Sequence, residues 1–200
     1  MGLFSFFKFR KADKSAISVS KRNEYLPSSW EDEYCRIEII PSANKTFIES
    51  QAKQVEEQSA KSRTDFNSKE VFTGKRVPVP LISMEIRADY LERKLIAFKF
   101  QKVEHIQFRG KKLLDCETNN IKAFGFSSFT IFFDVESEFV KNICIKIDLI
   151  VSASEFDLLE AALYDLGKSY GLLLINWYKV EIIDLANKKQ VQEYLMGYWK

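Results

Sequence analysis

The sequence is poor in the residues that most often build metal and cofactor sites. His105 is the one histidine among 200 residues, which excludes a metal site built from several histidines. The seven glycines form no dinucleotide-binding pattern, and the Gly-Lys pairs at Gly74 and Gly110 lack the other residues of a phosphate-binding loop. We therefore expect neither a metal nor a cofactor.

Cysteines and long apolar runs are also scarce. Cys35, Cys116 and Cys144 are widely spaced and form no Cys-x-x-Cys pair, so the sequence indicates neither a disulfide framework nor a zinc site. This usage fits a reducing, cytoplasmic environment. No apolar stretch approaches the roughly 20 residues that cross a bilayer, and we expect no stable membrane insertion.

Charge is distributed unevenly along the chain. The net charge is +2, but residues 1–24 contain six basic and two acidic residues, so the remainder carries −2. Phosphate recognition needs a basic stripe, and the mildly acidic remainder therefore argues against nucleic-acid binding. The polar, serine-rich stretch after Lys11 predicts a flexible arm over 1–29, followed by a single domain over 30–200.

The first eleven residues, MGLFSFFKFRK, combine four phenylalanines with basic residues. The apolar run ends at Lys8, too early for a secretory signal, and Phe6 stands where a myristoylation signal has Ser or Thr. On a helical wheel Arg10 and Lys11 fall on the side of the phenylalanines, which leaves too short an apolar face for firm membrane binding. We expect this stretch to fold back on the domain or to meet a partner, with weak membrane contact as the alternative.

Hydrophobic periodicity predicts an α+β fold with a mostly antiparallel sheet and about three helices packed on one face of it. Helical spacing predicts a helix after Ser42, a helix over 152–171 that is capped by Ser154 and ends at Gly171, and a C-terminal helix capped by Asn187. A long surface loop is expected over 59–75, with a partly disordered insertion as the competing interpretation. Alternating apolar residues predict strands at 35–39, 82–86, 96–100, 106–108, 129–133, 143–151 and 172–185. For residues 88–95, between the second and third of these strands, a helical turn is the open alternative.

Motifs for catalysis are weak. GFSSF at 125–129 lacks the second glycine of a nucleophile elbow. Glu92 and Lys94 have the Glu-x-Lys spacing of metal-dependent nucleases, with Asp65 or Asp89 as a further ligand, and His105 is a candidate general base. Such a short match is common in a chain with 29% charged residues. We expect that the protein is not an enzyme, and we keep a metal-dependent hydrolase or nuclease as an alternative function.

Two acidic clusters are the candidate partner-binding residues. Trp30, Glu31, Asp32 and Glu33 lie where the arm meets the predicted domain, and such a cluster joins aromatic affinity to fast electrostatic steering of a basic partner. The competing interpretation is a buried Trp30 with solvated acids beside it. The second cluster is Asp134, Glu136 and Glu138, for which a solvated turn is the competing interpretation. Alternating carboxylates of this kind also occur in calcium-binding loops, but Phe139 stands where such a loop has glycine.

The sequence pattern resembles one group of bacterial proteins. The stretches that carry the resemblance are WEDEYCRIEIIP, GFSSFTIFFD, SEFDLLEAALYDLG, LLLINWYKVEII and QVQEYLMGYW. Over residues 30–200 the chain resembles small immunity proteins encoded beside polymorphic toxins of contact-dependent or type VI secretion systems. The resemblance implies a non-enzymatic cytoplasmic inhibitor that binds a cognate toxin and occludes its active site. A membrane-peripheral adaptor that uses the basic arm is the alternative function.

Overall fold

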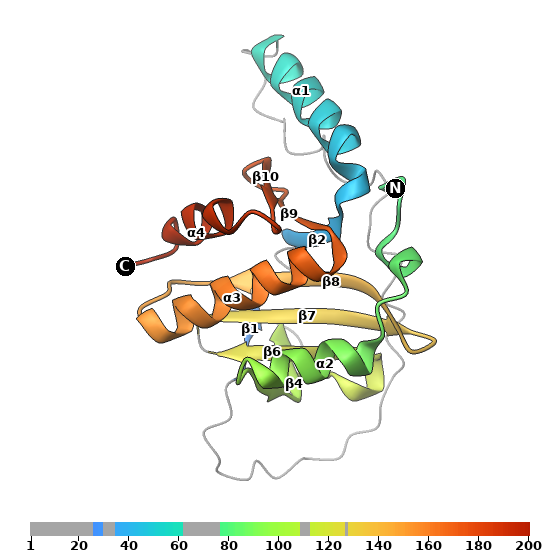
Figure 1. The fold of residues 1–200 in the computed structure, drawn as a ribbon, viewed down its shortest axis with the longest axis vertical. Coiled ribbons are helices and arrows are strands. Elements are labelled where there is room, and N and C mark those ends of the chain that lie inside the picture. Colours follow the sequence, from blue (N-terminus) through green and yellow to red (C-terminus); the bar gives the residue numbers. More distant parts are fainter. Residues whose placement is uncertain (1–25, 30–34, 62–76, 109–112, 127) are drawn as a thin grey trace.

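The computed structural model describes residues 26–29, 35–61, 77–108, 113–126 and 128–200 (Figure 1). In this part of the chain, four α-helices accompany a seven-stranded and a three-stranded sheet, which confirms the α+β class. Trp30, Glu31, Asp32 and Glu33 lie outside the described residues, as does most of the loop predicted over 59–75.

The seven-stranded sheet is antiparallel throughout, as predicted. Its spatial order is β10-β9-β2-β8-β7-β6-β3. The early strand β2 therefore lies between two late strands, β8 and β9. The strands are β2 (Ile37–Pro41), β3 (Gln101–Val103), β6 (Ile121–Phe126), β7 (Phe129–Glu136), β8 (Phe139–Ile147), β9 (Leu172–Asn176) and β10 (Glu181–Asp184).

Three helices cover one face of this sheet. They are α2 (Ala88–Ala97), α3 (Ala153–Tyr170) and α4 (Lys188–Met196). Their apolar stripes, such as Leu91 and Leu95 of α2 or Leu159 and Leu163 of α3, are fully buried against alternate residues of the strands. Within the described residues no helix is long and apolar enough to cross a membrane.

The small sheet and helix α1 (Lys45–Lys61) pack on the opposite face of the seven-stranded sheet. The small sheet of β1 (Ser28–Ser29), β4 (His105–Phe108) and β5 (Leu113–Asp115) buries Ile106 and Leu114 against Phe132 and Cys144. The first turns of α1 bury Ile48 against β2 and β9, and Figure 1 shows the rest of this helix extending away from the sheet. The prediction that all helices pack on one face is therefore wrong for α1.

Two predicted strands are also wrong. The stretch 82–86 begins in a 3-10 helix, Leu81–Met84, and the stretch 96–100 spans the end of α2 and the turn after it. Three alternating apolar residues fit either period, whereas the fully buried Leu91 and Leu95 have the spacing of a helix face. Ile96 is 53% exposed, so it does not belong to a buried strand face.

Other predicted boundaries shift. The strand predicted over 172–185 is the hairpin of β9 and β10, and β8 ends at Ile147. The cap of α3 is Ser152, whose hydroxyl accepts from the backbone of Glu155, and not Ser154. The Gly171 terminus, with φ of 62°, and the Asn187 cap of α4 are confirmed.

The cysteine spacing indicated no disulfide framework, but the structure contains one disulfide. Cys35 and Cys144 are bonded, with their Cα atoms 4.8 Å apart and a sequence separation of 109. The bond depends on β2 pairing with β8, where Glu38 lies opposite Cys144. Sequence spacing carries no information on such a pairing, because the connection between the two strands is long.

Candidate functional site

The second predicted acidic cluster lies at the hairpin between β7 and β8. Asp134 is half-buried on β7, where it accepts a hydrogen bond from Asn142 at 2.9 Å. The other two carboxylates are more exposed and join intrachain ion pairs. These pairs are Glu136 with Lys141, and Glu138 with Arg87 at 3.2 Å. The cluster is therefore one half-buried and two exposed acids, each already engaged with a neighbour.

The residues considered for a nuclease point in different directions. Glu92 pairs with Lys122 of β6, whereas Lys94 reaches Asp165 and Ser169 of α3. His105 lies on β4, with its imidazole 3.9 Å from Asp115. Asp89 pairs with Arg87 and Arg93, and Asp65 lies outside the described residues. Among the residues that the structure describes, no group of three or more His, Cys, Asp or Glu side chains is arranged to hold a metal.

The turn between β9 and β10 presents aromatic and basic side chains to solvent. Residues 177–180, here called the hairpin tip, connect Asn176 to Glu181, which are partners in the ladder. Tyr178 is 76% exposed and Lys179 is exposed beside it. The guanidinium of Arg36 lies 5.8 Å from the centre of the Tyr178 ring. This grouping of Trp, Tyr and Arg has the composition in which protein interfaces concentrate their binding energy.

Asn176 fixes the shape of the hairpin tip. Its side chain is buried, and its Oδ1 accepts hydrogen bonds from the backbone N–H groups of Tyr178 at 3.1 Å and Lys179 at 3.2 Å. Its Nδ2 donates to the hydroxyls of Tyr194 and Tyr198, both at 3.3 Å. One amide thus both closes the turn and attaches it to α4 and the residues that follow α4.

The other side of the hairpin tip is held by β2. The backbone N–H of Trp177 donates to the carbonyl of Arg36 at 2.9 Å, and its indole Nε1 donates to Glu38 Oε2 at 2.9 Å. Burial raises the pKa of the Glu38 carboxyl; the indole hydrogen bond lowers it and the nearby charge of Asp134 raises it further. Glu38 is therefore a positioning group for Trp177.

Val180 completes the turn in a strained conformation. Its φ is 56°, in the left-handed region that β-branched residues rarely adopt. Such a conformation costs on the order of 1–3 kcal/mol and persists only where the surroundings impose it. The hydrogen bonds of Asn176 and the ladder beside it supply that constraint, so they hold the hairpin tip in a conformation that its local sequence does not favour.

A polar layer lies beneath the hairpin tip. The hydroxyls of Tyr194 and Tyr198 are 3.1 Å apart, and burial is the main cause that raises the pKa of Tyr194. Lys179 Nζ lies 5.3 Å from the centre of the Tyr198 ring. Glu181 Oε2 is buried and has no hydrogen-bond partner among the described residues. The tyrosine with the raised pKa stays neutral near pH 7, so this layer supports the tip and provides no activated nucleophile.

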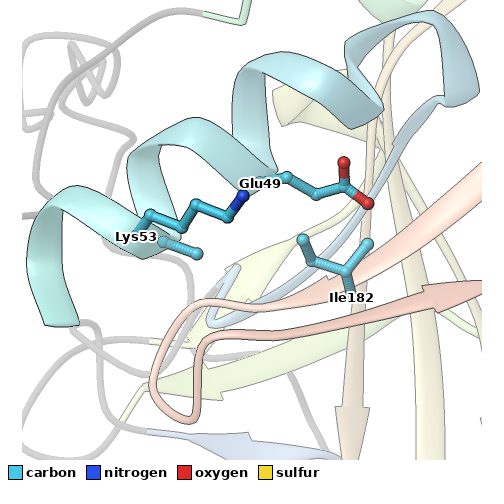
Figure 2. A pocket seen from close by; sticks show the side chains of 4 residues that line it. Glu49, Lys53 and Ile182 are labelled. Atoms are coloured by element: carbon cyan, nitrogen blue, oxygen red, sulfur yellow. The ribbon is translucent and has the colours of Figure 1, made fainter.

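A hollow of about 430 Å³ lies near this hairpin, between α1 and β10. Figure 2 shows Glu49 and Lys53 of α1 on one side and Ile182 of β10 on the other. Ala52 completes the lining. The lining is thin and mixes one acid, one base and two apolar residues, which is not a set that converges on a small ligand.

The hairpin tip is not predicted from the sequence, because the largely apolar run 172–185 has the pattern of one strand. The available signal is the segment Asn176-Trp177-Tyr178-Lys179, which interrupts an apolar run with an amide and a basic residue. Asparagine is a common turn former, but tryptophan, tyrosine and valine favour strands.

Comparison of the chain with protein-family models, with curated proteins and with solved structures found no match.

Proposed function

We propose that this protein is a non-enzymatic binding protein that recognises a partner protein through the β9–β10 hairpin tip. The observation that carries the proposal is the 76% exposure of Tyr178 on a turn. The side chain of Asn176 holds the backbone of this turn in place. A large aromatic side chain on a rigid turn binds with little loss of conformational entropy. Arg36 stacks on the same ring and adds a cation beside it.

Within this class, we propose an immunity protein that acts in the cytoplasm and neutralises a cognate toxin by occluding its active site. The support for this narrower role is the resemblance in sequence pattern described above. Trp30, Glu31, Asp32 and Glu33 stay candidate contacts with the toxin. Asp134, Glu136 and Glu138 form the proposed acidic rim, in which the two exposed glutamates would have to exchange their ion pairs with Lys141 and Arg87 for contacts with a basic partner.

The test uses the full chain and a toxin domain encoded beside its gene. Tyr178→Ala is expected to weaken binding by about 30-fold or more, the effect of truncating an interface hot spot. Tyr90→Ala is the matched control, because Tyr90 is 44% exposed on α2 and also lies near a cation, Arg93. Titration calorimetry measures both variants. Equal affinities for Tyr178→Ala and wild type would remove the hairpin tip from the interface.

A further inference from the structure

The disulfide lies one residue from a group that holds the hairpin tip. Cys35 is bonded to Cys144, and the next residue, Arg36, accepts the backbone hydrogen bond of Trp177 and stacks on Tyr178. Cys35 itself has φ of 60°, so the chain bends there before β2 begins. The position of Arg36 is thus fixed on one side by the disulfide and on the other by β2.

The two bonded cysteine residues differ in exposure. Cys35 is half-buried, whereas Cys144 is 2% exposed. The third cysteine, Cys116, belongs to the same apolar cluster, but burial is the largest cause that raises the pKa of its thiol to about 12. A thiol that stays protonated is a poor nucleophile, so an external thiol that attacks Cys35 is the route by which this bond opens.

We propose that the Cys35–Cys144 disulfide is a redox switch that controls the order of the hairpin tip, and through it partner binding. The inference rests on the proposed function, since the tip is the proposed binding surface. In a reducing compartment a disulfide is usually transient and redox-sensing. This role fits a bond in which one of the two cysteines, Cys35, is only half-buried. With the bond closed, Arg36 is held and the tip is ordered; with the bond open, residues 35–36 are released.

The reaction is thiol–disulfide exchange with a low-molecular-weight thiol such as glutathione. The external thiolate attacks the sulfur of Cys35, the bond between the two protein sulfurs breaks, and Cys144 leaves as a thiolate that takes up a proton. A second external thiolate attacks the external sulfur of the mixed disulfide and releases Cys35, which is protonated in turn. Two external thiols are thereby oxidised to one disulfide while the protein gains two thiols.

The experiment compares amide hydrogen exchange of the wild-type chain in oxidised and in reduced glutathione. In the reduced protein, the amide of Trp177 is expected to exchange at least about tenfold faster, because its acceptor, the carbonyl of Arg36, is then held by β2 alone. The amide of Val191, inside α4, is the internal reference and should not change. This comparison needs no substitution, so a variant that fails to fold does not affect it.

Two variants complete the test. Cys116→Ser should keep the redox response, since Cys116 has no disulfide partner. The double variant Cys35→Ser with Cys144→Ser should show the fast exchange in both buffers. The inference is overturned if Trp177 exchanges equally in both redox states, or if alkylation and mass spectrometry find Cys35 and Cys144 as free thiols after incubation with oxidised glutathione. Either result leaves the effect of Tyr178→Ala on binding, and so the proposed function, intact.

Discussion

At the residue scale, buried polar side chains determine the conformation of the hairpin tip. The amide of Asn176 uses both its donor and its acceptor groups, which avoids the cost of about 1–3 kcal/mol for each unsatisfied buried group. Glu38 is less well compensated. Its hydrogen bond from Trp177 favours the ionised carboxylate, but burial outweighs that effect and raises its pKa. The ionised form of Glu38 therefore lowers the stability of the fold.

Replacing Glu38 by glutamine is expected to stabilise the protein at neutral and alkaline pH. A carboxyl whose pKa is raised on folding contributes stability below its unfolded pKa, and this contribution is lost as the pH rises through the folded pKa. Glutamine retains an acceptor for Trp177 Nε1 and has no charge to desolvate. In urea denaturation, Glu38→Gln should gain stability over wild type at about pH 8 and much less at about pH 4.

The matched control is Glu193→Gln, which changes an exposed carboxyl on α4. This variant should show no comparable difference between the two pH values. If Glu38→Gln gained equally at both pH values, or lost stability at the higher one, burial would not dominate at Glu38.

At the element scale, the β9–β10 hairpin forms against its local sequence preferences. The turn has four residues, and Val180 takes the left-handed conformation that glycine or asparagine adopts at little cost. Local propensity favours a continuous strand through Trp177, Tyr178 and Val180. Contacts made elsewhere, by Asn176 to Tyr194 and Tyr198, stabilise the turn instead.

Val180→Asn is expected to raise the thermal stability by about 1 kcal/mol, because asparagine tolerates the left-handed region that costs valine about 1–3 kcal/mol. Loss of the half-buried valine methyl groups offsets part of this gain. Val151→Asn serves as the control, since Val151 is 67% exposed and its φ is not positive. A lower melting temperature for Val180→Asn than for wild type would show that the turn is not strained at this residue.

At the scale of the whole molecule, the central place of β2 joins the two ends of the described chain. Its pairing with β8 and β9 brings Cys35, Arg36 and Glu38 next to a turn about 140 residues later in sequence. Helix α3 also lies very close to the residue that follows this hairpin. Gly167 of α3 lies so near Leu185, just after β10, that a Cβ at position 167 would meet Leu185 Cβ at 2.3 Å.

Gly167→Ala is expected to destabilise the protein by about 1–3 kcal/mol, the range for overpacking a well-packed core. The alanine methyl group must push α3 away from the backbone of Leu185, and this cost exceeds the helix propensity that alanine adds. Gly197→Ala, whose nearest obstacle is Tyr194 O at 3.2 Å, should cost less. Urea denaturation measures both variants. Unchanged stability of Gly167→Ala would mean that α3 is free to shift on the sheet.

The features predicted correctly from the sequence are those set by residues close together along the chain. The terminus of α3 at Gly171 and the cap of α4 at Asn187 follow from local backbone chemistry. The strand prediction over 82–86 fails because three alternating residues do not separate the two periods. The hairpin tip is not predicted, since Asn176 closes it locally but is itself held by Tyr194 of α4 and by Tyr198, and Trp177 is held by Glu38 of β2.

The sequence by itself determined the α+β class, the antiparallel sheet and the amphipathic helices, because hydrophobic periodicity and caps act over a few residues. Only the tertiary structure decided that Cys35 bonds to Cys144, that Arg36 stacks on Tyr178, and that Val180 keeps a strained backbone conformation in the hairpin tip. The first two of these contacts join segments more than 100 residues apart in sequence. Their formation depends on the order of strands in the sheet, which local patterns along one chain do not encode.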